Sequence, residues 1–140
     1  MQRAFCYLEG EQTKERKYCL NNRKIGAQFE TVAAELLKQQ GFHILEKNYR
    51  CKTGEIDLIA REGEYLVFIE VKYRKNARKG FAVDAVTREK QKKICRTADF
   101  YMRQHHMFGD MCIRFDVAAI DGKEIRIVKN AFPYVGAVRF

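Results

Sequence analysis

The chain has little that would divide it or place it in a membrane. Its 140 residues include a single proline, Pro133, and no low-complexity segment or long linker. No apolar run approaches the roughly 20 residues that a membrane-spanning helix needs, and the first residues lack the apolar stretch of a secretory signal. We therefore expect one domain with a hydrophobic core, in a cytoplasmic protein without membrane association.

Cysteine is present without a metal-binding or disulfide pattern. No two cysteines are spaced as C-x-x-C, which argues against a zinc site, and an odd, scattered set argues against a disulfide framework. Free thiols in a reducing cytoplasm fit best. The five cysteines are Cys6, Cys19, Cys51, Cys95 and Cys112.

Positive charge is abundant and concentrated. The chain has 27 Lys and Arg residues against 18 Asp and Glu, a net charge of +9. From Lys72 to Arg103 there are 11 basic residues and only three acids, Asp84, Glu89 and Asp99. Basic proteins attract polyanions through phosphate contacts and counterion release. Net charge alone also fits a protein that is merely basic, so the concentration is what favours nucleic acid as the partner.

Two apolar segments, Gly54–Ala60 and Leu66–Lys72, contain acids where a buried strand should have none. A buried carboxylate costs several kcal/mol unless a cation or a metal offsets it. Asp57 and Glu70 therefore need a positive partner. Alternation along a strand places Glu70 and Lys72 on one face, roughly 6–7 Å apart at their Cα atoms.

The polar, glycine-containing residues 61–64 between the two segments predict a hairpin turn. One register of that hairpin places Asp57 beside Glu70. Two carboxylates at that distance repel unless a positive charge lies between them, and Mg²⁺ suits two carboxylates plus waters. A purely structural alternative is an ion-paired hairpin, in which Lys72 neutralises Glu70 and Asp57 caps a turn.

Asp57, followed after a turn by Glu70-Val71-Lys72, resembles the PD-(D/E)xK phosphodiesterase signature. That superfamily includes type II restriction endonucleases and archaeal Holliday-junction resolvases. Longer segments resemble one bacterial branch of it, the YraN-like family, over roughly residues 22–132. Those segments are Asn48–Arg50, Gly54–Ala60, Val67–Arg74 and Arg114–Val117.

The resemblance implies metal-dependent hydrolysis of a phosphodiester. Asp57 and Glu70, helped by the backbone carbonyl of Val71, would hold Mg²⁺ or Mn²⁺. The metal would polarise the phosphate and lower the pKa of bound water. Lys72 would orient or help deprotonate the attacking water and stabilise the developing negative charge.

Two helical residues complete the predicted site. A helix over 22–40 has Glu30 at the edge of its apolar stripe, and a helix over 84–105 has Lys90 within its stripe. Related nucleases often place an acid and a polar or basic residue at these positions. By that resemblance Glu30 would bind a second metal, directly or through water, and Lys90 would contact the phosphate. The alternatives are a solvated acid and a lysine at the edge of the helix.

The polar segment 73–81 follows directly on the predicted site. A charge run is usually only a solvated surface. This one is flanked by Tyr73 and Phe81, which suits contact with phosphates or unpaired bases. The residues predicted to contact nucleic acid are Arg74, Lys75, Arg78, Lys79 and Lys93.

Together the patterns predict a single α/β domain with a central mixed sheet flanked by helices, in the order αβββαββ. The resemblance adds that the fold is restriction-endonuclease-like. Further strands are expected at 42–49, as an outer strand of the sheet, and at 111–120 and 125–128, which a turn at Asp121-Gly122 joins as a hairpin. The expected division is an N-terminal extension (1–21), the nuclease-like domain (22–132) and an apolar tail (133–140) that packs on the body or a partner subunit.

We therefore expect a metal-dependent endonuclease that acts on nucleic acid, with branched or otherwise structured DNA as one substrate class. The sequence does not distinguish DNA from RNA as the substrate, nor a duplex from a junction, a flap or a single strand. A non-catalytic nucleic-acid-binding or adaptor module on the same fold is the main alternative. A protein-interaction subunit that uses the apolar tail is a third. Because resolvases cut as dimers, the resemblance also implies that the chain could form a homodimer.

Overall fold

The computed structural model describes residues 22–74, 86–107, 109–122 and 124–136. Two helices and five strands follow one another in the predicted order αβββαββ. Their bounds are α1 Asn22–Gln39, β1 His43–Cys51, β2 Gly54–Glu62, β3 Tyr65–Arg74, α2 Arg88–Gln104, β4 Cys112–Asp121 and β5 Glu124–Val128.

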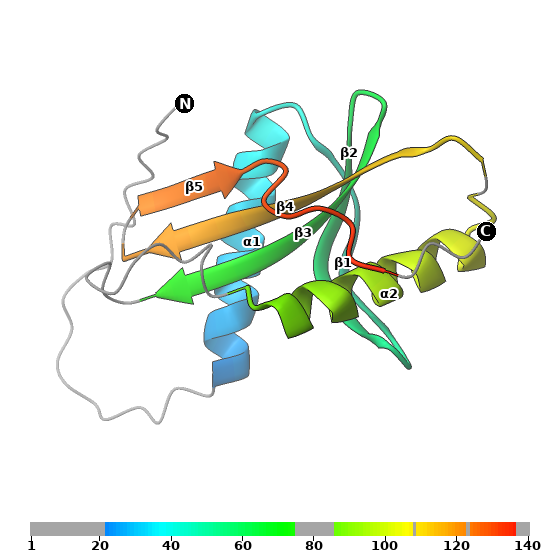
Figure 1. Ribbon diagram of the computed structural model, residues 1–140. Coiled ribbons are helices and arrows are strands. Elements are labelled where there is room, and N and C mark those ends of the chain that lie inside the picture. Colours follow the sequence, from blue (N-terminus) through cyan, green and yellow to red (C-terminus); the bar gives the residue numbers. More distant parts are fainter. Residues whose placement is uncertain (1–21, 75–85, 108, 123, 137–140) are drawn as a thin grey trace, which may run out of the picture.

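The strands form one mixed sheet in the order β1-β2-β3-β4-β5 (Figure 1). Strands β3 and β4 are parallel, and the other neighbouring pairs are antiparallel. The parallel pair requires a crossover, which α2 supplies. This single mixed sheet with two helices confirms the predicted α/β class and is consistent with a restriction-endonuclease-like fold.

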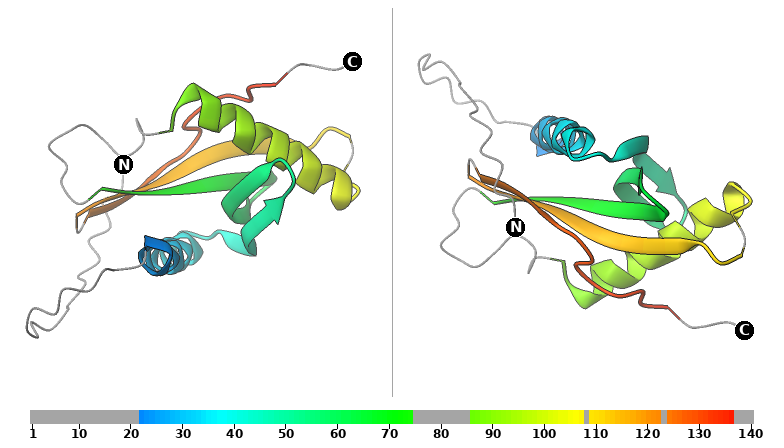
Figure 2. Two further views of the ribbon diagram at one scale, coloured as in Figure 1. Left: turned by 90° about the horizontal axis from the view of Figure 1, so that it is seen from below. Right: turned by 90° about the horizontal axis from the view of Figure 1, so that it is seen from above.

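The two helices cover opposite faces of the sheet (Figure 2). Ala33, Ala34 and Leu37 of α1 pack on one face. Ile94 and Ala98 of α2 pack on the other. Because both faces are covered, the central strands carry apolar residues on both faces rather than in alternation with polar ones, which is why the acids in them stood out in the sequence.

The second helix begins later than predicted. It starts at Arg88 rather than at 84, because Thr87 is its N-cap and accepts a hydrogen bond from the Lys90 N–H at 3.3 Å. Val86 is buried although it precedes the helix, so its apolar side chain extended the apparent helical stripe. β1 also extends beyond the predicted end, to Cys51.

The C-terminal segment packs along α2 as far as the described residues go. Phe132 is buried in the core on the α2 side. The Val135 N–H donates to Cys95 Sγ at 3.2 Å, and the Tyr134 hydroxyl donates to Asp99 at 2.8 Å. The predicted extension 1–21 lies outside the described residues. Within the described part of the chain, no helix combines the length and apolar character needed to cross a membrane.

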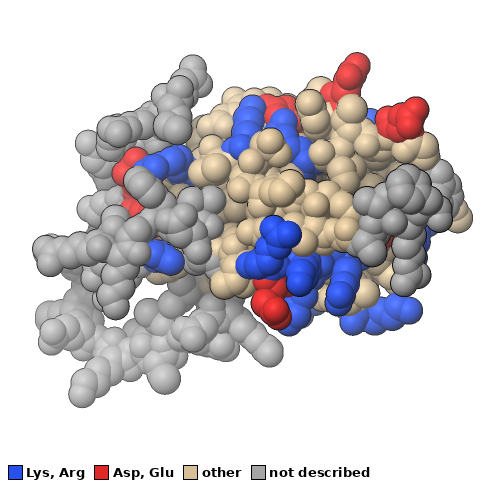
Figure 3. All heavy atoms as spheres, in the orientation of Figure 1, with Lys and Arg blue, Asp and Glu red and all other residues tan. Residues whose placement is uncertain are grey.

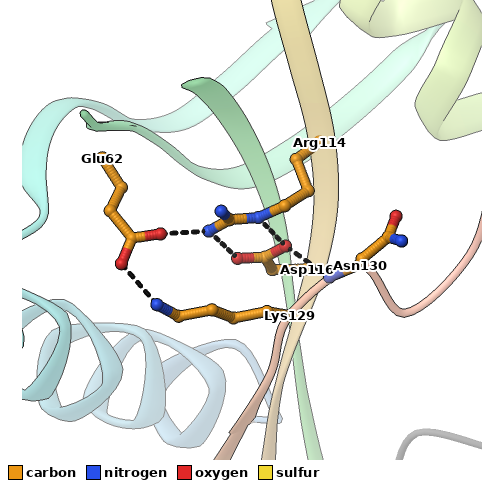
Figure 4. Close-up of polar contacts among 5 residues, drawn as sticks. All are labelled: Glu62, Arg114, Asp116, Lys129 and Asn130. Atoms are coloured by element: carbon orange, nitrogen blue, oxygen red, sulfur yellow. Dashed lines mark hydrogen bonds and ion pairs between the residues drawn. The ribbon is translucent and has the colours of Figure 1, made fainter. Parts of the chain in front are cut away.

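An ion-pair network around the buried Asp116 joins β2 and β4 to the segment after β5 (Figure 4). Arg114 donates to both carboxylate oxygens of Asp116 at 2.8 Å and to Glu62 at 2.6 Å. Lys129 pairs with Glu62, and the Asn130 N–H donates to Asp116 at 2.9 Å. Asp116 has no exposed surface, so these partners stabilise a fully buried carboxylate.

Candidate active site

The two predicted acids lie where the pairing of β2 with β3 stops. The ladder ends with Leu58 opposite Ile69, and the next residues along the two strands are Asp57 and Glu70. The Val71 N–H then donates to Asp57 Oδ2 at 2.8 Å. The Asp57 carboxylate therefore accepts the hydrogen bond of a backbone N–H that lies beyond the end of the ladder. This bond holds Asp57 next to Glu70.

Glu70 is buried and only partly compensated. Only 4% of the surface of Glu70 is exposed. Lys72 Nζ lies 3.1 Å from Glu70 Oε1, and Lys90 Nζ lies 3.5 Å from the same oxygen. Among the described residues, Oε2 of Glu70 has no hydrogen-bond partner. Oε1 of Glu70 therefore lies near two ammonium groups, while Oε2 has no hydrogen-bond donor among the described residues.

Asp57 is strongly affected by its surroundings. Burial and then the nearby charge of Glu70 raise the pKa of Asp57 to about 7. The Val71 N–H and the charge of Lys90 act in the opposite direction on the same pKa. An added cation between Asp57 and Glu70 would offset both the burial and the repulsion.

Glu30 reaches the same cavity from α1. Burial raises the pKa of Glu30, and a side-chain hydrogen bond from Asn48 partly lowers it. Asn48 lies on β1, across from Asp57 in the β1–β2 pairing, and has a left-handed φ of 54°. Asparagine tolerates this conformation better than most residues, and such backbone often occurs at functional sites. Sequence reasoning gave Asn48 no role, although it stood in a matching segment.

The acids and lysines line one cavity of about 230 Å³. Residues of α1, α2, β2 and β3 contribute to this cavity, so the site depends on how the helices pack on the sheet and not on the β2–β3 hairpin alone. Its lining residues are Gly26, Phe29, Glu30, Glu55, Asp57, Glu70, Val71, Lys72, Tyr73 and Lys90.

The donor set suits a hard divalent cation. The oxygens of Asp57 and the unpartnered Oε2 of Glu70 are the kind of ligands that Mg²⁺ and Mn²⁺ prefer, with water filling the remaining positions. Among the described residues, no three His, Cys, Asp or Glu side chains lie together in the geometry of a metal site. Glu30 lines the same cavity, so it is a candidate for contact with such a cation either directly or through water.

The predicted nucleic-acid contacts are only partly described. Lys75, Arg78 and Lys79 lie outside the described residues. Arg74 ends β3, opposite Asp121 in the parallel ladder. Lys93 is exposed on α2, one turn after Lys90.

Lys93 belongs to a basic surface that extends along α2. Figure 3 shows Lys and Arg side chains gathered over this helix. We define the α2 basic surface by its exposed members Arg88, Lys92, Lys93, Arg96 and Arg103.

Comparisons with known proteins match most of this chain to one family. Residues 29–120 match the family described as "Uncharacterised protein family UPF0102". A UPF0102 protein from Lachnoclostridium phytofermentans is 47% identical over 118 residues, covering 84% of this chain and 100% of that relative. A UPF0102 protein from Vibrio parahaemolyticus is 43% identical over 113 residues, covering 79% and 93%. One from Legionella pneumophila is 46% identical over 105 residues, covering 74% and 89%.

Proposed function

This chain belongs to the UPF0102 family, the YraN family that its motifs resemble, and from the geometry of its cavity we propose that it is a metal-dependent endonuclease. The observation that carries the proposal is the pair of adjacent acids at the end of the β2–β3 ladder. Asp57 and Glu70 share one cavity with two lysines, and Glu70 keeps one oxygen without a donor. The proposed reaction is hydrolysis of a nucleic-acid phosphodiester, with branched or structured DNA as a substrate class.

Asp57, Glu70 and the backbone carbonyl of Val71 would hold Mg²⁺ or Mn²⁺, and Glu30 would support the site directly or through water. When bound, such a cation polarises the phosphate and lowers the pKa of bound water. Asp57 is already oriented for this role by its hydrogen bond from the Val71 N–H. Oε2 of Glu70 would bind the cation without giving up a hydrogen bond, because it has no partner among the described residues.

The two lysines supply positive charge from different elements. Lys72 comes from β3 and Lys90 from α2, and their side chains are 30% and 29% exposed. Both ammonium groups are therefore held by Glu70 while part of each side chain stays accessible. Lys72 would donate to the attacking water and stabilise the developing negative charge, and Lys90 would donate to a phosphate oxygen. The α2 basic surface would contact the flanking phosphates.

A cleavage assay tests this proposal directly. Labelled single-stranded, duplex, flap and four-way-junction DNA, with matching RNA strands, would be incubated with the full chain in Mg²⁺, Mn²⁺ or EDTA. We expect cleavage that needs metal and that falls by about 10²-fold or more in Asp57→Asn and in Glu70→Gln. Glu64→Gln, in the exposed β2–β3 turn, is the matched control. Cleavage that persists in EDTA or in both variants would contradict the proposal.

A non-catalytic binding module is the second candidate. The observation that favours it is that Lys72 and Lys90 already neutralise Glu70, while the described residues contain no three-ligand metal cluster. This function predicts salt-sensitive binding of nucleic acid that survives Asp57→Asn and Glu70→Gln, without cleavage of any substrate. The same assay, read alongside binding by fluorescence anisotropy, separates the two functions.

A further inference from the structure

Two aromatic rings stack on each other in the lining of the cavity. Phe29 of α1 and Tyr73 of β3 have ring centroids 3.9 Å apart and planes at 17°. Both residues line the cavity that contains Asp57 and Glu70. They are brought together only by the packing of α1 on the sheet, since they come from different elements.

The pair has one supported ring and one accessible ring. Phe29 is half-buried and packs against the apolar cluster around Ile120 and Ile125. Tyr73 is 41% exposed although one face of its ring is covered by Phe29. Its exposed area therefore lies on the other face and on the edge of the ring. Phe29 holds that ring in a fixed plane, so little side-chain freedom would be lost when a ligand stacks on it.

The position of the ring relative to the lysines is also defined. Alternation along β3 places Tyr73 on the α1 side of the sheet and Lys72 on the α2 side. The cavity extends round the end of the β2–β3 ladder and reaches both sides. A nucleotide whose phosphate meets the lysines can thus direct its base past the strand end towards Tyr73.

We infer that the Phe29–Tyr73 pair is a stacking platform for an unpaired nucleobase adjacent to the phosphate in the site. This inference rests on the proposed function, and it narrows the substrate to nucleic acid with at least one unstacked nucleotide: a single strand, a flap or a branch point. Bases inside a continuous duplex already have both faces covered, and extracting one costs a few kcal/mol. Stacking on an aromatic side chain is tolerant of base identity, so little sequence preference is expected.

The test measures binding of the full chain in EDTA, where cleavage does not interfere. The probe is a single-stranded oligonucleotide with one 2-aminopurine, and a continuous duplex of the same sequence is the comparison. Tyr73→Leu should weaken single-strand binding by roughly five- to a hundredfold and abolish the quenching of 2-aminopurine that stacking causes. Tyr73→Phe should keep both, and duplex binding should be unchanged in every variant.

Tyr65→Leu is the matched control. Tyr65 lies at the other end of β3, about 26 Å from Tyr73 at ~3.3 Å per residue, and is 44% exposed. Equal single-strand binding by wild type and Tyr73→Leu would overturn the platform, as would equal losses in Tyr73→Leu and Tyr65→Leu. Thermal unfolding of each variant shows whether the comparison is between folded proteins.

The two proposals fail in different ways. If the wild type cleaves nothing but binds single strands through Tyr73, the platform stands and the nuclease proposal fails. If cleavage needs Asp57 and Glu70 but acts equally on continuous duplex and is unchanged in Tyr73→Leu, the nuclease proposal stands and the platform fails.

Discussion

The backbone N–H of Val71 donates a 2.8 Å hydrogen bond to Oδ2 of Asp57, at the first step beyond the β2–β3 ladder. The Asp57 carboxylate is therefore part of the scaffold as well as a candidate ligand. Asparagine at this position would keep an oxygen that can accept the same hydrogen bond. Asp57→Asn thus removes the charge with little change to the backbone, which makes it the variant of choice for separating electrostatics from structure.

Asp57→Asn should stabilise the metal-free protein at high pH. Burial raises the pKa of Asp57 in the folded state to about 7 from an ordinary value of 3.8. The folded state therefore holds a proton that the unfolded chain releases, and this contribution to stability is complete below about pH 4 and lost as pH rises towards 7. At pH 8 the variant should exceed wild type by at least about 1 kcal/mol in free energy of unfolding.

Urea unfolding in EDTA at pH 5 and pH 8 measures this prediction. The advantage of Asp57→Asn over wild type should shrink as the pH is lowered from 8 to 5. Glu64→Gln, in an exposed turn, should show no comparable dependence on pH. An advantage of Asp57→Asn that is the same at both pH values would contradict the assigned protonation.

The sequence allowed the central part of this site to be predicted because local rules set it. The short turn at Gly63 and Glu64 fixes the hairpin register, and that register leaves Asp57 and Glu70 as neighbours. The apolar stripe on the second helix was enough to direct Lys90 towards the sheet, even though the predicted start of that helix was wrong.

Asn48 and the Phe29–Tyr73 stack could not be predicted in the same way. The hydrogen bond from Asn48 to Glu30 depends on how closely α1 approaches β1 and on a left-handed backbone at Asn48. The stack depends on the rotation of α1 over the end of β3. Both are set by packing between elements, for which periodicity and spacing contain no signal.

Lys72→Met should separate stability from cation binding. Lys72 is the nearer of the two cations to the buried Glu70, at 3.1 Å against 3.5 Å for Lys90. Removing it should lower the free energy of unfolding in EDTA by about 1–3 kcal/mol, because Lys90 compensates only in part. Mg²⁺ should then raise the melting temperature of the variant more than that of wild type, since less positive charge opposes the ion.

Thermal melts across a Mg²⁺ titration check this prediction for Lys72→Met, with the exposed Lys47→Met as control. Cleavage by Lys72→Met should fall even where Mg²⁺ binding is tighter, because the donor to the attacking water is lost. Weaker binding of Mg²⁺ by the variant would show that Lys72 does not compete with a cation at Glu70.

Two substitutions at Asn48 should distinguish its backbone role from its side-chain role. Asn48→Ala removes the hydrogen bond to Glu30 and also strains the left-handed backbone at φ 54°, which costs about 1–2 kcal/mol. Asn48→Gly removes the same hydrogen bond but relieves that strain. We expect Ala to be the less stable of the two variants in chemical unfolding. Both should reduce Mg²⁺-dependent activity to a similar extent if Asn48 acts by positioning Glu30.

Equal activity in wild type and Asn48→Gly would contradict the positioning role of the side chain. Equal stability of Asn48→Gly and Asn48→Ala would contradict the backbone role. Glu30→Gln provides a further comparison, since its effect on activity should not add to that of Asn48→Gly when the two residues act as one unit.

Arg114→Met should destabilise the fold without changing the rate of cleavage by the folded protein. Arg114 is the cation shared by Asp116, which is fully buried, and by Glu62 (Figure 4). Among the residues that the structure describes, its removal leaves the Asn130 N–H as the one hydrogen-bond donor to the Asp116 side chain, so the free energy of unfolding should fall by about 3–5 kcal/mol. Lys38→Met breaks an exposed pair with Glu35 and should leave that free energy nearly unchanged.

The same variant also tests whether the site is separable from this network. Arg114 is not among the residues that line the cavity of Asp57 and Glu70. Cleavage per folded molecule should therefore match wild type at temperatures well below the melting point of the variant. A loss of activity in Arg114→Met that exceeds the unfolded fraction measured by circular dichroism would mean that the network sets the position of β3, and with it the spacing of the two acids. Normal activity with a lowered melting temperature would assign Arg114 to stability alone, because a buried carboxylate left without its cation weakens the fold wherever it lies.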